Sequence, residues 1–227
     1  MMIEIKKLCK SKTILYLMIV ILVISLSFFI FALKGIDDDL AFDDKQTIST
    51  EFNFELIFYC MPIFTVFLAD FVFNKDMNMG TMKHLIIRSD RRKIYIYKII
   101  SLIIAAILLN IAFNLTNSLL LQFKFDIKVV GRFLKAALYE NIPIIEMSLV
   151  FALVSMVSKK NNIVYLISLQ FIFLFLTESS LLLGKYTYVH DFKMAILEGH
   201  LSVFSMIKIF VLFLTSYLIF KNKELVE

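Results

Sequence analysis

The sequence contains few residues that interrupt helices, and it has no tryptophan. Its 227 residues include only five glycines and two prolines. Because glycine and proline are the usual points at which helices end or bend, their scarcity predicts long uninterrupted helices. The two cysteines, Cys9 and Cys60, lie before the first long apolar run and inside the second, so we expect no disulfide between them.

Motifs for catalysis and for cofactor binding are also missing. No GxxxxGK(S/T) segment occurs, which excludes a Walker-type ATP site in this chain. There is no HExxH segment and no paired-histidine or paired-cysteine metal site, and the three histidines all fall in predicted loops. No arrangement of side chains supports acyl-transfer chemistry. We therefore expect that the chain is not an enzyme and binds no cofactor or metal itself.

Apolar side chains are abundant instead. They make up 60% of the chain, and the mean hydropathy is +0.83. Six apolar runs are each long enough to cross a hydrocarbon core of about 30 Å at about 1.5 Å per residue. These runs cover residues 14–33, 54–73, 99–121, 136–157, 163–183 and 203–220. They predict an all-α, multi-pass protein of the cell membrane, with one six-helix domain over residues 1–227.

Basic residues predict how the helices are oriented. Short loops rich in Lys and Arg stay in the cytoplasm, whereas acidic residues have little influence. Loop 74–98 holds seven basic residues against two acidic ones, and loop 34–53 holds only two basic residues. Over all predicted loops and tails, 15 basic residues fall on one side and 8 on the other. Both termini are therefore predicted to be cytoplasmic, with residues 1–12 forming an interfacial helix. The net charge of +5 reflects this topology, and we expect no nucleic-acid partner.

The basic loop 74–98 contains the pattern of a short amphipathic helix. Its residues are Gly80, Thr81, Met82, Lys83, His84, Leu85 and Ile86. The glycine and the threonine can open the helix, with the threonine hydroxyl as its cap. The methionine, leucine and isoleucine then form one apolar stripe, beside the lysine and the histidine. Asp90 can cap the helix that follows. From charge alone, the loop either docks onto a partner or lies on anionic lipid.

The order of features around this pattern resembles that of ABC transporter permeases of the type-2 class. An apolar span is followed by an acidic residue, Gly-Thr, a short helix, an arginine, and a lysine that enters the next span. The residues that fit are Gly80, Thr81, Lys83, Arg91 and Lys98. Asp76 stands where the family usually has Glu, and Arg88 stands where a Pro is common. The segment lies between the second and third of the six predicted spans.

The resemblance implies a function. In that family the segment contains the coupling helix, which sits in a cleft of a separate ATPase subunit. The coupling residues implied here are Asp76, Gly80, Thr81, Met82, Lys83, His84, Leu85 and Ile86. The chain would be the membrane half of an ATP-driven exporter, paired with a second copy or a paralogue, while ATP and Mg²⁺ bind the partner ATPase. Similar small permeases resemble peptide exporters, bacteriocin immunity systems or drug pumps, and the sequence does not choose among these cargoes.

Three asparagines inside the third span are candidates for a translocation path. Asn110, Asn114 and Asn117 recur every three or four residues, so they share one helical face. Amides on one face are costly against lipid and should point into protein or water. They either hydrogen-bond between helices or line a path for the substrate, and both interpretations stay open.

Three carboxylates complete the candidates for the path, namely Glu140, Glu146 and Glu178. A carboxylate inside a membrane is a functional candidate by default, because burying its charge is costly. Lys135 and Lys185 can reach Glu140 and Glu178 as partners. Glu146 has no obvious basic partner, so we expect a protonated side chain or a wet cavity, with a neutral structural carboxyl as the other interpretation. The alternative function is an ATP-independent carrier or a passive immunity protein that uses Glu146.

Overall fold

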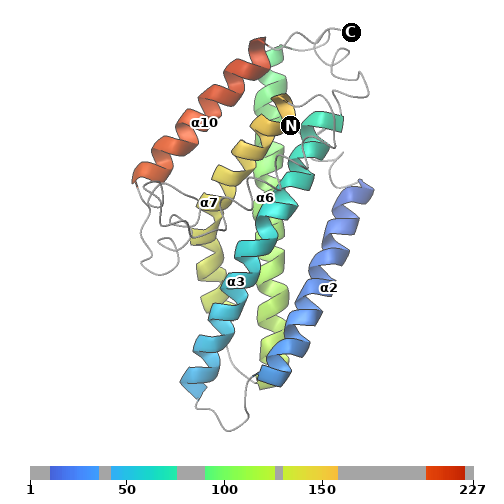
Figure 1. Cartoon of the computed structure of the whole chain (residues 1–227), viewed down its shortest axis with the longest axis vertical. Coiled ribbons are helices and arrows are strands. Elements are labelled where there is room, and N and C mark those ends of the chain that lie inside the picture. The colour runs from blue at the N-terminus through green and yellow to red at the C-terminus, as the bar shows by residue number, and fades with distance from the viewer. Residues whose placement is uncertain (1–10, 36–41, 76–89, 126–129, 158–202, 223–227) are drawn as a thin grey trace.

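The described part of the chain is entirely helical. In the computed structural model, it comprises residues 11–35, 42–75, 90–125, 130–157 and 203–222, and no strand occurs among them. Its elements are α2 (Lys12–Gly35), α3 (Phe42–Ala69), the π-helical turn η1 (Asp70–Asn74), α6 (Arg91–Phe125), α7 (Val130–Val157) and α10 (Val203–Asn222). Figure 1 shows these helices as one bundle. The predicted all-α fold class is confirmed.

Four of the described helical stretches are long and apolar enough to cross a membrane. They are Leu56–Asn74, Arg91–Phe123, Phe133–Val157 and Ser205–Asn222, and a shorter apolar stretch, Ile14–Ser27, lies within α2. The chain is therefore a multi-pass membrane protein. The predicted fifth span, 163–183, and the first ten residues of the predicted interfacial helix lie outside the described residues. The count of six spans and the side of the termini stay predictions.

The two ends of the bundle differ in which helix ends they contain. Towards the top of Figure 1 lie the first turn of α6, η1 and the last turns of α7 and α10, and α2 also begins at its upper end. Exposed basic side chains there are Lys12, Lys75, Arg92, Lys93 and Lys221. We call this end the inner end, because its basic residues predict that it faces the cytoplasm. The opposite end is the outer end.

α6 is the central helix of the bundle. It packs against α2, α3, α7 and α10, whereas α10 packs mainly on α7. At the inner end, the buried ring of Tyr95 lies against Phe213, Tyr217 and Phe220, with centroids 5.4–5.5 Å apart. α2 and α10 keep many large apolar side chains exposed, among them Leu15, Leu22, Phe210 and Leu214. In a membrane protein such faces suit lipid or another membrane helix.

Several helices begin earlier than the apolar runs predicted. α3 starts at Phe42, so part of the predicted outer loop 34–53 is helical, and α7 starts at Val130 rather than at residue 136. Hydropathy marks only the apolar centre of a helix, whereas backbone hydrogen bonding continues into polar turns until a breaker occurs. No glycine or proline stands between Phe42 and Pro62. The connections that precede α3 and α7 are therefore shorter than predicted.

The predicted cap at Asp90 is confirmed. Its carboxylate Oδ1 accepts the backbone N–H of Arg92 at 3.1 Å, and its carbonyl accepts the N–H of Ile94 at 3.1 Å. This arrangement satisfies N–H groups that a helix start leaves without a partner. It begins α6 at Arg91, eight residues before the predicted start of the span at residue 99. The basic residues 91–93 are therefore helical and form its first turn.

Candidate functional site

A cluster of buried amides joins three helices. It consists of Asn53 from α3, Asn110, Asn114 and Asn117 from α6, and Glu140 and Asn141 from α7. Each of the six residues is at most 9% exposed. We call it the amide cluster. The three asparagines predicted to share a face do lie together, and they meet a neighbouring helix on each side.

Hydrogen bonds run through the amide cluster in one direction. The Nδ2 of Asn117 donates to Asn53 Oδ1 at 2.5 Å, and Asn53 Nδ2 donates to Asn114 Oδ1 at 3.0 Å. Asn114 Nδ2 donates in turn to Glu140 Oε2 at 2.9 Å. A second bond to α7 joins Asn110 Nδ2 to Asn141 Oδ1 at 3.1 Å. The chain of donors ends on a carboxylate, the strongest acceptor in the cluster.

At Asn117, where this series of hydrogen bonds begins, one acceptor has no donor in the described part of the protein. Within the described part of the protein, Asn117 Oδ1 is buried and receives no hydrogen bond. The sequence left two interpretations open for the three asparagines. The described contacts contain the first of them, hydrogen bonding between helices. A role of the same residues in a translocation path stays a prediction. Sequence analysis missed Asn53 and Asn141, because which residues of other helices face Asn110 and Asn114 depends on packing.

Glu146 has a basic partner after all. Its Oε1 lies 3.0 Å from Lys208 Nζ of α10, and both side chains are largely buried. The expectation of a carboxylate without a basic partner is therefore wrong. Lys208 lies in the last predicted span, and the sequence alone does not place that span beside α7. The ion pair therefore connects α10 to α7 through polar side chains.

The partner expected for Glu140 is not the one it contacts. Lys135 is exposed, whereas Glu140 is 1% exposed and accepts a bond from Asn114. The two residues are five positions apart in α7, which places them on different sides of the helix. Glu178 and Lys185, the other predicted pair, lie outside the described residues.

A further polar site lies near the inner end. Lys98 of α6 is fully buried, and its Nζ donates to the carbonyl of Val72 in η1 at 2.6 Å. In the same turn, Asn74 Nδ2 donates to Asp70 Oδ1 at 2.8 Å. Sequence analysis singled out Lys98 only as the lysine that enters a span. The spacing of Asp70 and Asn74, one turn apart, was an available signal for this site.

Comparison with known proteins identifies the family of this chain. A family model described as ABC-2 family transporter protein matches residues 1–177. The chain belongs to the ABC-2 transporter family. No curated protein and no solved structure matches it. Its family and its long apolar helices make it a multi-pass protein of the plasma membrane and a permease subunit of an ABC transporter.

Membership of the ABC-2 family implies that an ABC ATPase is the partner subunit. Family members are typically the transmembrane, non-catalytic partners of an ABC ATPase. In the described part of this ABC-2 permease, no group of three His, Cys, Asp or Glu residues is arranged to hold a metal ion. The predicted coupling residues, Asp76 and Gly80 to Ile86, lie outside the described residues. They belong to segment 76–89, which leaves the described helices after Lys75 and rejoins them at Asp90.

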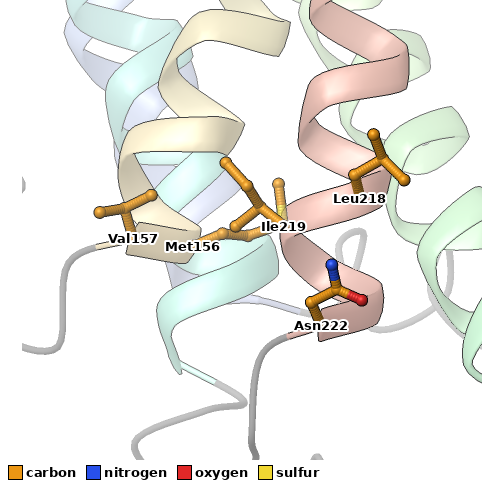
Figure 2. A pocket seen from close by; sticks show the side chains of 5 residues that line it. All are labelled: Met156, Val157, Leu218, Ile219 and Asn222. Atoms are coloured by element: carbon orange, nitrogen blue, oxygen red, sulfur yellow. The ribbon is translucent and has the colours of Figure 1, made fainter.

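The permease also has an open groove at its inner end. Figure 2 shows its lining, with Met156 and Val157 from the end of α7 and Leu218, Ile219 and Asn222 from the end of α10. The volume is about 410 Å³. Four of the five side chains are apolar and none is ionisable, so the groove offers no acid, base or nucleophile for chemistry.

Proposed function

We propose that this permease belongs to an ATP-driven exporter that moves an amphipathic cargo, such as a peptide, a toxin or a drug-like compound, out of the membrane or cell. The observation that carries the proposal is the position of segment 76–89 along the chain. It connects η1 to α6, and α3 and α6 both contribute to the amide cluster. A partner that moves this segment therefore acts on two of the three helices that form the amide cluster.

The proposed contact with the ATPase uses the predicted coupling helix. The side chains of Met82, Leu85 and Ile86 would insert into a groove of the ATPase, where each buried aliphatic side chain contributes about 1.5–3 kcal/mol. Lys83 and His84 would lie at the rim, where charges affect association more than affinity. The remaining coupling residues, Asp76, Gly80 and Thr81, would shape the entry to the helix. ATP and Mg²⁺ bind the ATPase in this proposal.

The proposed translocation path uses the polar residues inside the spans. They are Asn110, Asn114, Asn117, Glu140, Glu146 and Glu178. Support comes from the burial of several amides and two carboxylates in otherwise apolar helices, since such residues are expensive in a membrane and typically functional. The exposed apolar faces of α2 and α10 support contact with lipid and with a second permease copy or a paralogue.

The ion-coupled carrier is the weaker proposal. A carrier of that kind needs a carboxylate that gains and loses a proton during transport. The Oε1 of Glu146 lies 3.0 Å from Lys208 Nζ, so this side chain already contacts a basic group of α10. The residue on which the alternative depended is thus occupied by an ion pair.

Copurification tests the coupling assignment. In the double variant Leu85→Asp and Ile86→Asp, two charges replace the apolar stripe, so we expect a normally inserted permease that no longer retains its ATPase. Lys93→Ser, which changes an exposed lysine outside the coupling residues, is the control and should retain it. The readouts are the amount of ATPase that copurifies with the tagged permease and the rate of ATP hydrolysis. Undiminished copurification and hydrolysis in the double variant would refute the assignment.

Cysteine labelling tests the topology on which the proposal depends. In a background with Cys9→Ser and Cys60→Ser, single cysteines replace Asp43 and Lys83. We expect a membrane-impermeant reagent to label position 43 in intact cells and position 83 only after lysis. The reverse pattern would show that segment 76–89 lies outside the cell, where no ATPase can reach it.

A further inference from the structure

The turn that precedes segment 76–89 has an unusual helical form. All five residues of η1, Asp70–Asn74, are buried, and the N–H of Lys75 donates to the carbonyl of Asp70, five residues back. Such π-helical turns are wider than α-helical turns and are frequent at functional sites. The internal bond from Asn74 to Asp70 adds a polar interior to this turn. α3 therefore ends in a distinct structural unit.

Lys98 reaches η1 from the other side of segment 76–89. Its Nζ donates to the Val72 carbonyl at 2.6 Å and lies 5.9 Å from the centre of the Phe73 ring. A cation near the C-terminal end of a helix is favoured by the helix dipole. A bond from an ammonium to a carbonyl is also stronger than a bond between neutral groups. The contact links the end of α3 to α6 through a short hydrogen bond.

A buried ammonium is a costly way to attach two helices if attachment is all that is needed. Apolar side chains of similar size often stabilise a buried site equally well or better. They also tolerate sliding, because dispersion contacts have little directionality. The bond from Lys98 to Val72, in contrast, is directional, because it depends on where the Val72 carbonyl lies. Lys98 is therefore suited to fix where η1 lies relative to α6.

We propose that Lys98 is a positioning residue that clamps η1 to α6, so that both ends of segment 76–89 move as one body. The inference rests on the proposed function, in which an ATPase moves that segment. The segment leaves the described helices after Lys75 and returns at Asp90, about two turns before Lys98. With the clamp in place, displacement of either end moves α3 and α6 together. Without it, the two helix ends are displaced separately, and the motion is lost at the inner end.

A distance measurement between the two ends tests the clamp. Spin labels replace Lys75 and Arg92, both exposed, in a background with Cys9→Ser and Cys60→Ser. The full chain is measured with its ATPase by double electron–electron resonance, without nucleotide and after trapping with ATP and vanadate. With Lys98 present, we expect a narrow distance distribution that trapping does not change. In Lys98→Met, we expect a broader distribution that shifts to longer distances on trapping.

Two further variants separate positioning from general stability. Lys93→Met removes an exposed lysine from the same helix and should leave both distributions unchanged. Lys98→Arg keeps the charge and the donor, so it should restore a narrow distribution in both states. A Lys98→Met protein with an unchanged, narrow distribution in both states would overturn the clamp. If that variant does not fold, Lys98→Gln replaces it with the same expected result and the same overturning result.

The failure of the clamp can be distinguished from the failure of the proposed function. The clamp variants leave the coupling helix intact, so each should still copurify with the ATPase. A chain with Lys98 that retains no ATPase contradicts the proposed function. In that case, the nucleotide-free distributions of the chain with Lys98 and of Lys98→Met still decide whether the clamp exists.

Discussion

Glu140 and Glu146 lie on the same helix, less than two turns apart, yet their environments differ in kind. Glu140 accepts a bond from the neutral amide of Asn114, in a cluster that also includes residues of α3. Glu146 lies 3.0 Å from the ammonium of Lys208 on α10. A buried carboxylate needs compensation, and this permease provides it by amide dipoles at one position and by an opposite charge at the other. The first arrangement depends on hydrogen bonds from neutral amides, and the second includes an ion pair.

Pro143 separates the two carboxylates along α7. It lies inside the helix, so it has no N–H to donate to the carbonyl of Tyr139, four residues back. The backbone ladder of hydrogen bonds is therefore interrupted between Glu140 and Glu146. The described polar contacts of the outer half of α7 are with α3 and α6, while the ion pair of its inner half is with α10. The two carboxylates thus belong to differently anchored parts of one helix.

Removal of Lys208 from the ion pair should have the largest effect. In Lys208→Met, Glu146 keeps a buried charge without its ammonium, and breaking such a pair costs about 3–5 kcal/mol. We expect a clearly lower unfolding temperature of the purified chain in detergent. The double variant Glu146→Leu with Lys208→Met removes both charges and should regain most of the loss. If Lys208→Met were as stable as the parent chain, the ion pair would contribute nothing to stability.

Neutralising each carboxylate in turn should sharpen the comparison. Glu146→Gln leaves the ammonium of Lys208 opposite a neutral amide, and we expect a loss of about 1–3 kcal/mol. Glu140→Gln keeps an acceptor for Asn114, so we expect a change below about 1 kcal/mol. Both variants are compared by unfolding in mixed micelles of detergent and sodium dodecyl sulfate. A larger loss at position 140 would reverse our interpretation of the two sites.

The sequence predicted contacts along one helix better than contacts between helices. The shared face of Asn110, Asn114 and Asn117 follows from spacing alone, because the helical period determines which residues lie on one side. The partners of those residues could not be predicted, since Asn53 stood at the end of a predicted loop. Lys208 was visible as a charge inside a span, but its distance from Glu146 depends on how α7 and α10 pack.

The layout of the helices was predictable to a similar extent. The end of α7 at Val157 and the start of α10 at Val203 coincide with the ends of apolar runs. The π-helical form of η1 was not predictable, because its residues read as the apolar end of a span. Its form depends on hydrogen bonds between residues five apart and on contacts with α6. Local periodicity carries no information on either.

The smallest expected effects lie within the amide cluster, and they test whether its bonds are equivalent. Asn114 donates to Glu140 and accepts from Asn53, so Asn114→Leu leaves a donor and a carboxylate short of a partner. We expect a loss of about 1–2 kcal/mol, near the upper end for polar contacts in membranes. Unfolding in the same mixed micelles measures it.

Asn117→Leu is the matched variant at the end of the same chain of donors, on the same helical face. It removes the donor to Asn53, but it also removes Asn117 Oδ1, the buried acceptor that receives no bond in the described part of the protein. One unpaired oxygen, on Asn117, is thus exchanged for another, on Asn53. Since the number of buried acceptors without a donor does not change, only one amide bond is lost, and we expect a loss of about 0.6 kcal/mol. Equal losses for Asn114→Leu and Asn117→Leu would mean that the order of donors toward Glu140 does not matter. The cluster would then act as uniform polar packing, and the contrast with the ion pair of Glu146 would rest on charge alone.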